Sequence, residues 1–402
     1  MLTVSSLLSN PLLQNFRVAA GRGGLGNTIL STGYFEYEQD NDIVKAFPHG
    51  EFVITTLFAA KDNVSLSEKA LKLLINNHVA AIAIKNVYFD DVTDEIKAYA
   101  DRYNVPILIF SKTYIDDLIV LIHDKLSDSI RNTEDENTIT ALIFDQSADI
   151  SRKEFMLRKL NQFFYSDTVF AAYISNDSDI SHVSDKATDE YMLISEKIKE
   201  TLPSQADGVY YAHAFTIYRR GMFFISTCSS AEDEDVEKFT SMLTSVLLDS
   251  KLLENHRIGY SEPIHGFADI SSLLIESIYA NTSCCLRDKH RLEFGNAGTD
   301  KLLLPQIYTP DYKEYYSETL AMLSPQGNSS STLLDTVLAF TDHGGNIEGV
   351  ANSLFQHKNT IRYRINKISA LLGTENDIAF YSALHIFTTI HRARKYLDTF
   401  FK

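Results

Sequence analysis

The stretch Gln356-His357-Lys358-Asn359-Thr360-Ile361-Arg362-Tyr363-Arg364-Ile365-Asn366-Lys367-Ile368 determines how the C-terminal part of the chain folds. Its three isoleucines, followed by Leu372, recur at helical spacing and form one apolar stripe. The other faces are polar, and residues 356–372 contain four basic residues and no acidic one. The stretch therefore predicts an amphipathic helix with a basic exposed face.

A shorter helix is predicted immediately before it, in residues 347–355. Asn346 can cap this helix, and Val350, Ala351 and Leu354 share one of its faces. Two short helices, of which the second is amphipathic and basic, form the pattern of a helix-turn-helix. The alternative is a plain helical hairpin whose basic face is only solvated.

We interpret the pair as a DNA-binding element, because polar side chains cluster in the first turns of its second helix. These side chains can hydrogen-bond base edges and phosphates, and no acidic residue offsets them. The residues expected to read bases are His357, Lys358, Asn359 and Thr360. The residues expected to hold the DNA backbone are Arg362, Tyr363, Arg364 and Asn346.

The charge distribution sets this C-terminal module apart from the rest of the chain. The whole chain of 402 residues carries a formal net charge of −16, which argues against nucleic-acid binding by its entire surface. Residues 331–402 contain eight Lys and Arg against six Asp and Glu, a net of +2, which leaves −18 for residues 1–330. The sequence thus predicts a mildly basic module attached to an acidic body.

Other features of the composition indicate a soluble cytoplasmic protein without metal or cofactor. Cys228, Cys284 and Cys285 form neither a disulfide framework nor a paired zinc motif. The N-terminus lacks the cationic start of a signal peptide, and no apolar run approaches the roughly 20 residues of a membrane span.

The first 128 residues are predicted to form an α/β domain. Short apolar runs of buried-strand length alternate with helical patterns, which is typical of a mainly parallel sheet covered by helices. The predicted strands are residues 16–20, 51–56, 80–84 and 106–110, and the predicted helices are residues 67–77, 91–103 and 115–130. Residues 131–137 are polar and aperiodic, and we interpret them as a domain boundary.

Residues 138–300 are predicted to form a second, ferredoxin-like domain. Their patterns follow the order strand–helix–strand–strand–helix–strand–helix, an arrangement shared by nucleotide cyclases and by many binding domains. The predicted hairpin turn Arg219-Arg220-Gly221 carries no carboxylate, although cyclase chemistry needs acidic metal ligands there. We therefore predict that the chain is not an enzyme. A linker at residues 325–331 would separate this region from the helix-turn-helix domain, residues 325–402.

Two further motifs in the first domain have ordinary structural explanations. Gly21-Arg22-Gly23-Gly24-Leu25-Gly26 fits the dinucleotide pattern G-x-G-x-x-G, but a strand or turn pattern follows it where a phosphate site needs a helix. We favour a tight loop over a ligand or interface. Asp90, Asp91, Asp94 and Glu95 form an acidic cluster that the start of a helix explains without a metal.

The stretch Leu354-Phe355-Gln356-His357-Lys358-Asn359-Thr360-Ile361-Arg362-Tyr363-Arg364-Ile365 closely resembles the helix-turn-helix signature of the purine catabolism regulator (PucR/CdaR-type) family. That signature runs Leu-Phe-x-His-basic-Asn-Thr-aliphatic-Arg-Tyr-Arg-aliphatic. Residues 50–56 and 78–85 look like the N-terminal sensory domain of the family. Ile258-Gly259-Tyr260-Ser261 resembles its GGDEF-like middle domain, which is degenerate here in the catalytic turn.

The resemblance implies a dimeric transcription factor that senses a metabolite through its N-terminal or middle domain. It further implies a homodimer on an inverted-repeat operator in double-stranded DNA. It does not identify the effector or the residues that bind it. The alternative is a nucleotide-binding signalling protein or enzyme that uses the GGDEF-like middle domain.

Overall fold

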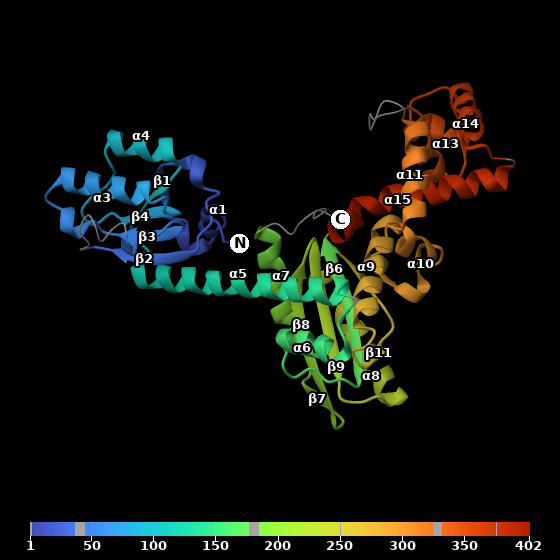
Figure 1. The fold of residues 1–402 in the computed structure, drawn as a ribbon, viewed down its shortest axis with the longest axis horizontal. Coiled ribbons are helices and arrows are strands. Elements are labelled where there is room, and N and C mark those ends of the chain that lie inside the picture. The colour runs from blue at the N-terminus through green and yellow to red at the C-terminus, as the bar shows by residue number, and fades with distance from the viewer. Residues whose placement is uncertain are drawn as a thin grey trace. The chain divides into compact units, whose positions relative to one another are not determined.

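The computed structural model describes residues 2–36, 45–145, 147–176, 185–249, 251–324, 332–374 and 376–402. The chain divides into two compact units, Met1–Glu134 and Asp135–Lys402. Figure 1 shows the first unit in blue and teal and the second in colours from green to red. Across the described residues, no helix combines the length and the apolar character that a membrane crossing requires.

A five-stranded sheet forms the centre of the first unit. Its strand order is β1-β5-β4-β3-β2, with β1 antiparallel to β5 and the other neighbours parallel. The strands are β1 (Arg17–Ala20), β2 (Ser31–Phe35), β3 (Glu51–Thr55), β4 (Ala81–Lys85) and β5 (Ile107–Phe110). The four predicted strands are all present, and β2 lies where the sequence indicated a strand or turn.

Helices cover both faces of this sheet because its central strands are apolar on both sides. Leu74 and Ile96 pack with Val53 on one face, whereas Val4 and Leu118 pack with Phe52 on the other. The helices are α1 (Val4–Leu8), α3 (Val64–Asn76), α4 (Asp94–Tyr103) and the start of α5 (Ile115–Phe144), with short 3-10 turns η1 (Pro11–Leu13), η2 (Arg22–Gly24) and η3 (Phe58–Ala60).

Helix α5 differs from the sequence prediction. The helix was expected to end near residue 130, before an aperiodic boundary at residues 131–137, but it continues to Phe144. Residues 115–144 contain neither glycine nor proline, so nothing in the backbone ends the helix there. The division between the two units, at Glu134 and Asp135, therefore falls inside a helix.

The second unit contains a larger, mostly antiparallel sheet. Its order is β12-β10-β6-β9-β8-β7, and β11 pairs with β6. Among the described strands of this sheet, β10 and β12 pair in parallel and the other pairs are antiparallel. The strands are β6 (Thr168–Asn176), β7 (Gln205–Ala206), β8 (Val209–Tyr218), β9 (Gly221–Cys228), β10 (His256–Tyr260), β11 (Ile264–His265) and β12 (Arg291–Glu293).

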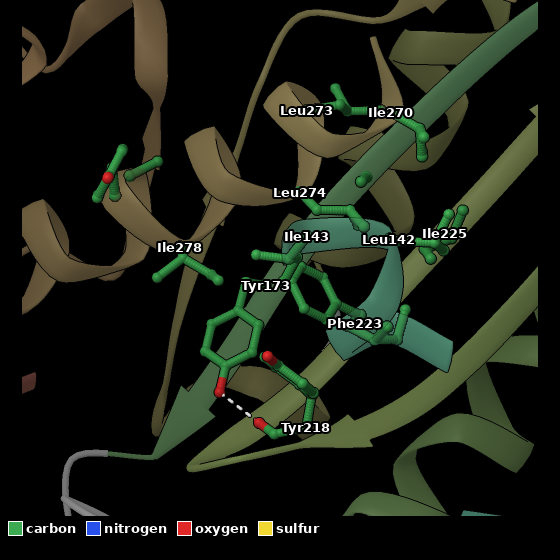
Figure 2. Close-up of a cluster of buried hydrophobic side chains, with 14 of the residues drawn as sticks. Leu142, Ile143, Tyr173, Tyr218, Phe223, Ile225, Ile270, Leu273, Leu274 and Ile278 are labelled. Carbon is green, nitrogen blue, oxygen red and sulfur yellow. Dashed lines mark hydrogen bonds between the residues drawn. The ribbon is translucent and has the colours of Figure 1, made fainter. Parts of the chain in front are cut away.

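Alternating side chains divide this sheet into two buried faces. Phe170 and Ile174 face α7 (Asp185–Thr201) and α8 (Asp233–Asp249), whereas Tyr173 faces the end of α5, α6 (Ile150–Leu160) and α9 (Ile270–Arg287). Figure 2 shows the second of these faces, where the Tyr173 hydroxyl donates to the Tyr218 carbonyl at 2.7 Å. These strands and helices follow the order that the sequence predicted for residues 168–286.

Gly259 on β10 allows α9 to approach the sheet closely. A Cβ atom at this position would lie 1.9 Å from the Asn281 backbone nitrogen. The Asn281 side chain then donates to the carbonyls of Tyr173 and Arg257, at 3.2 and 2.7 Å. The glycine thus lets a buried amide of α9 tie two strands together.

The chain ends in a group of helices that follows the sheet. The elements are η5 (Phe294–Asn296), α10 (Asp300–Leu303), η6 (Leu304–Gln306), α11 (Pro310–Leu323), α12 (Thr332–Asp342), α13 (Ile347–Ser353), α14 (Lys358–Leu372) and α15 (Asp377–Phe401). A further short turn, η4 (Lys251–Leu253), lies between α8 and β10. The predicted linker at residues 325–331 lies outside the described residues.

Helix α15 belongs to two hydrophobic cores at once. Phe380 and Phe387, in its first half, pack with α12 to α14, whereas Leu397 and Phe400 pack into the core of the middle sheet. The Phe400 ring lies 5.3 Å from that of Tyr173 between centroids. Helix α15 therefore joins the two cores, and α11 also contacts both of them through Tyr315 and Tyr316.

The end of α15 also covers Arg220, in the turn between β8 and β9. This guanidinium is completely buried and donates to Ser175 Oγ at 3.1 Å and Asn281 Oδ1 at 2.6 Å. The rings of Tyr396 and Phe400 lie 5.0 and 5.8 Å from it. We call this group, Arg220 with Ser175, Asn281, Tyr396 and Phe400, the arginine clasp.

We expect Phe400→Ala to destabilise the second unit by about 3–5 kcal/mol, because it empties a filled site in the core. Urea unfolding followed by circular dichroism measures the loss. The control is Ile378→Ala in the first turn of the same helix, where the Ile378 side chain is 80% exposed. This substitution should change stability by less than about 0.5 kcal/mol. Equal losses for both variants would contradict the docking of α15.

Candidate nucleic-acid interface

Helices α13 and α14 form a helix-turn-helix supported by α12 and α15. Val350 and Ala351 of α13 are buried, as are Ile361 and Ile368 of α14. Ile365 and Leu372 are partly buried against the same core. The apolar stripe predicted from the sequence is therefore the side of α14 that packs on the protein, and the polar faces remain outside.

Both helices begin with side-chain caps. The Asn346 Oδ1 atom accepts hydrogen bonds from the backbone nitrogens of Glu348 and Gly349, at 2.9 and 3.3 Å. The His357 Nδ1 atom accepts one from the Asn359 backbone nitrogen at 3.2 Å. These bonds satisfy backbone donors that a helix start otherwise leaves open. They leave the Asn346 amide nitrogen and the His357 Nε2 atom as groups that face outward.

The turn between the helices contains an exposed phenylalanine in a left-handed conformation. Phe355 has φ of 52° and is 93% exposed. Its backbone nitrogen donates to the Asn352 carbonyl, and that of Gln356 donates to the Ala351 carbonyl at 2.9 Å. This Schellman pattern normally places glycine where Phe355 stands. No role was predicted for Phe355 from the sequence, although a large apolar residue at the end of a helix is a visible signal.

The residues predicted to read bases lie in the exposed first turn of α14. His357, Lys358 and Asn359 are exposed, and Thr360 is partly exposed. Lys358 Nζ lies 2.7 Å from Glu348 Oε1 on the preceding helix. This hydrogen bond and charge lower the pKa of Glu348. Both side chains are largely exposed, so salt screens the ion pair and Lys358 can leave Glu348 for another anionic partner.

The residues predicted to hold the DNA backbone lie in different environments. Arg362 and Tyr363 are exposed, Tyr363 by 68%. Arg364 is partly buried, and its Nη1 atom donates to Thr336 Oγ1 of α12 at 3.4 Å. Asn346 is engaged as the cap of α13. Arg362 and Tyr363 therefore point into solvent, whereas Arg364 and Asn346 also have roles within the fold.

The glycine-rich loop of the first unit is packed against its own domain. A Cβ atom on Gly21 would lie 2.0 Å from the Val105 carbonyl oxygen, and one on Gly24 would lie 1.9 Å from that of Asn104. The Gly21 backbone nitrogen donates to Asp101 Oδ1 at 2.6 Å. The residues that follow form the three-residue turn η2, so the loop does not open an α-helix. The glycines serve a close contact between chain segments.

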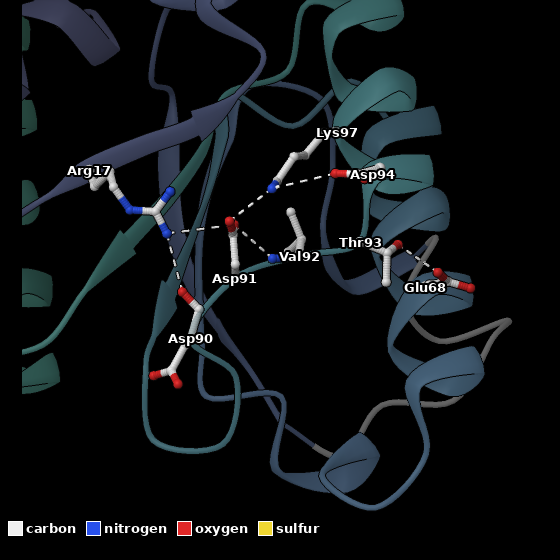
Figure 3. Close-up of polar contacts among 8 residues, drawn as sticks. All are labelled: Arg17, Glu68, Asp90, Asp91, Val92, Thr93, Asp94 and Lys97. Carbon is white, nitrogen blue, oxygen red and sulfur yellow. Dashed lines mark hydrogen bonds and ion pairs between the residues drawn. The ribbon is translucent and has the colours of Figure 1, made fainter.

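Asp91, Asp94 and Glu95 of the acidic cluster are paired with cations, whereas Asp90 accepts from Arg17 through its backbone carbonyl (Figure 3). Asp91 lies 2.8 Å from Lys97 and 3.5 Å from Arg17. Glu95 lies 2.5 Å from Lys72 of α3, and Asp94 and Glu95 occupy the first turn of α4. The helix start and these ion pairs account for the cluster.

Sequence comparisons match both ends of the chain. The profile of the purine catabolism regulatory protein-like family matches residues 6–126, and that of the PucR C-terminal helix-turn-helix domain matches residues 333–386. The purine catabolism regulatory protein of Bacillus subtilis is 32% identical over 71 residues, which is 18% of this chain and 13% of that protein. An uncharacterised protein of Mycobacterium tuberculosis is 39% identical over 54 residues, 13% of each chain.

The alignments therefore span only 13% of the length of these curated relatives. Among solved structures, a regulator of polyketide synthase expression from Bifidobacterium adolescentis is 17% identical, and the alignment covers 65% of this chain and 97% of that one. Its TM-score is 0.29.

We expect Asn346→Ala to destabilise the helix-turn-helix by about 1 kcal/mol, because it removes the side-chain cap of α13. Asn346→Asp, which keeps a capping oxygen, should retain stability. Urea unfolding of the three proteins measures both effects. If Asn346→Ala and Asn346→Asp were equally stable, the cap would contribute nothing.

Proposed function

The chain belongs to the purine catabolism regulatory protein-like family, and we propose from this premise that it is a DNA-binding regulator of transcription. The observation that carries the proposal is the geometry of α14. Its apolar side is buried against α12, α13 and α15, while its N-terminal turn and basic side are exposed. A helix supported in this way can enter the major groove with its first turn directed at the bases.

In this proposal His357, Lys358, Asn359 and Thr360 read base edges. Lys358 leaves Glu348 when it binds DNA, since an exposed ion pair is easily exchanged. The Glu348 carboxylate then stands near the DNA and repels phosphates wherever Lys358 finds no suitable base. The pair would thereby favour sites at which Lys358 gains a strong contact.

The DNA backbone is held by Arg362 and Tyr363, whose side chains point into solvent. Arg364 and Asn346 would add contacts from their present positions. Arg364 directs one of its five N–H donors to Thr336, and Asn346 uses only its oxygen as a cap. Each side chain thus retains donors for a phosphate.

One helix-turn-helix per chain favours a homodimer on an inverted-repeat operator. The half-sites would lie one helical turn, about 34–36 Å, or a multiple of this apart. We propose a cytoplasmic protein whose N-terminal domain, residues 1–128, or middle domain senses a small-molecule effector. The family match to residues 6–126 supports a sensory role for the first of these.

We further propose that residues 138–300 form a ferredoxin-like, degenerate GGDEF-like domain that relays the signal to residues 325–402. The antiparallel order β10-β6-β9-β8 of its central strands supports this assignment. Its hairpin turn holds Arg220 under α15 rather than metal-binding carboxylates. The alternative, a nucleotide-binding signalling protein or enzyme that uses this turn, is disfavoured because the clasp covers it.

We expect Lys358→Ala to relax sequence specificity, because it removes a base-reading side chain while the phosphate contacts remain. Arg362→Ala should weaken binding to all sequences and reduce the slope of log K against log salt by about 0.9, the value of one phosphate contact. Fluorescence anisotropy with operator and scrambled duplexes at several salt concentrations measures both quantities.

Lys395→Ala is the matched control, since it removes one positive charge from the half of α15 that docks on the middle domain. It should leave the affinity and the salt slope close to those of the wild type. Wild-type affinity and salt dependence for both Lys358→Ala and Arg362→Ala would refute the placement of α14 in the groove.

Phe355 provides an independent test, because we propose that its exposed ring contacts DNA beside the base-reading turn. Phe355→Gly should stabilise the fold by about 1 kcal/mol, since glycine adopts the left-handed conformation without strain. The same substitution should weaken operator binding several-fold. Phe355→Asn, which also tolerates this conformation, should weaken it similarly. A variant that is more stable and binds DNA as well as the wild type would exclude the contact.

A further inference from the structure

Residues 138–300 contain an open pocket of about 430 Å³, which lies beside β7 and the start of β8. A volume of this size is typical of small-molecule sites. Its walls come from the segment between α6 and β6, the end of α7, and the start of β8. The lining residues include Phe163, Tyr165, Lys199, Tyr210, Tyr211 and His213.

Exposed aromatic rings are the main feature of this pocket. Phe163 is 64% exposed and Tyr210 is 47% exposed. The rings of Tyr165 and Tyr210 lie 6.3 Å apart between centroids and are inclined by 33°. Aromatic rings in water gain free energy when a planar apolar group covers them. The rings therefore form a surface suited to stacking.

The wall behind the rings is fixed by hydrogen bonds. A carbonyl oxygen only accepts, so His213 Nε2 donates to the Pro203 carbonyl at 3.2 Å, and Nδ1 accepts from the Ser226 hydroxyl at 2.8 Å. Burial lowers the pKa of His213, which favours the neutral ring that this arrangement needs. Asn161 donates to the His213 carbonyl at 2.9 Å. The pocket is thus largely formed before a ligand binds.

The charged side chain in the lining of the pocket is basic. Lys199 is the charged side chain of its lining, and none of the described lining residues is acidic. The Lys199 ammonium lies 5.5 Å from the centre of the Phe215 ring, which is outside the lining. On a chain with a net charge of −16, a concave surface with a lysine and no acid favours an anion.

We propose that this pocket binds a planar aromatic anion, whose ring stacks on Phe163, Tyr165 and Tyr210 while its anionic group meets Lys199. That this ligand is the effector of the protein rests on the function proposed above. Strand β8 supports this role, because it begins at the pocket and ends at the turn that holds Arg220 under α15. The strand thus connects the ligand to the arginine clasp, roughly 30 Å away.

Isothermal titration of the full chain with three probes tests the pocket in the absence of DNA. 2-Naphthoate is planar and anionic, 2-naphthamide is planar and neutral, and decahydro-2-naphthoate is anionic but saturated. We expect 2-naphthoate to bind at least ten-fold more tightly than the other two. No binding of 2-naphthoate at millimolar concentration, or equal binding of all three probes, would overturn the proposal.

Variants locate the binding. Phe163→Ala and Lys199→Gln change exposed side chains, so both proteins should fold normally. Each should weaken 2-naphthoate binding at least five-fold, and Lys199→Gln should also abolish its advantage over 2-naphthamide. Phe155→Ala is the matched control, since Phe155 is 62% exposed on α6 with the Lys159 ammonium 5.0 Å from its ring centre, outside the pocket. An equal loss in the control would overturn the site.

The DNA experiment separates this inference from the proposed function. Operator affinity is measured with and without 2-naphthoate, for the wild type and for Phe163→Ala. A change in the wild type that is absent in the variant supports an effector site. Ligand binding without any operator binding would refute the regulator but retain the pocket. Operator binding that ignores a bound ligand would refute the effector role alone.

Discussion

The docking of α15 over Arg220 is the contact on which the second unit depends. Removing a guanidinium from water costs several kcal/mol unless hydrogen bonds and nearby negative potential replace the solvent. Among the described residues no carboxylate pairs with Arg220, so Ser175, Asn281 and the faces of two aromatic rings supply that replacement. Because both rings belong to α15, the charge is buried only while this helix is in place.

This arrangement links the helix-turn-helix to the sheet of the second unit. The first half of α15 closes the core of the helix-turn-helix, and its second half closes one face of the middle sheet. The hairpin turn between β8 and β9 anchors that helix through Arg220. Helices α11 and α15 both contact the two cores, so the signal relay proposed above has packed helices available to it.

Local patterns predicted the elements well but not the contacts between distant residues. Short apolar runs identified strands such as β3, and the caps and the apolar stripe of period 3.6 identified α13 and α14. The arginine clasp could not be predicted from local patterns. The sequence of a polar hairpin turn does not indicate that the last helix of the chain will bury it. The left-handed Phe355 and the aromatic pocket likewise depend on tertiary packing. The predicted end of α5 was too early because the polar residues 131–137 were interpreted as a domain boundary.

Because α15 is long, a small rotation at the arginine clasp would produce a larger displacement at the other end of the helix. A helix of 25 residues is about 37 Å long at about 1.5 Å per residue. A tilt of about 5° at its docked end would displace the far end by about 3 Å, close to the rise of one base step, about 3.4 Å. In the proposed dimer, the two recognition helices must match half-sites at a fixed spacing. A rotation of this size would shift one helix by about one base pair relative to the operator.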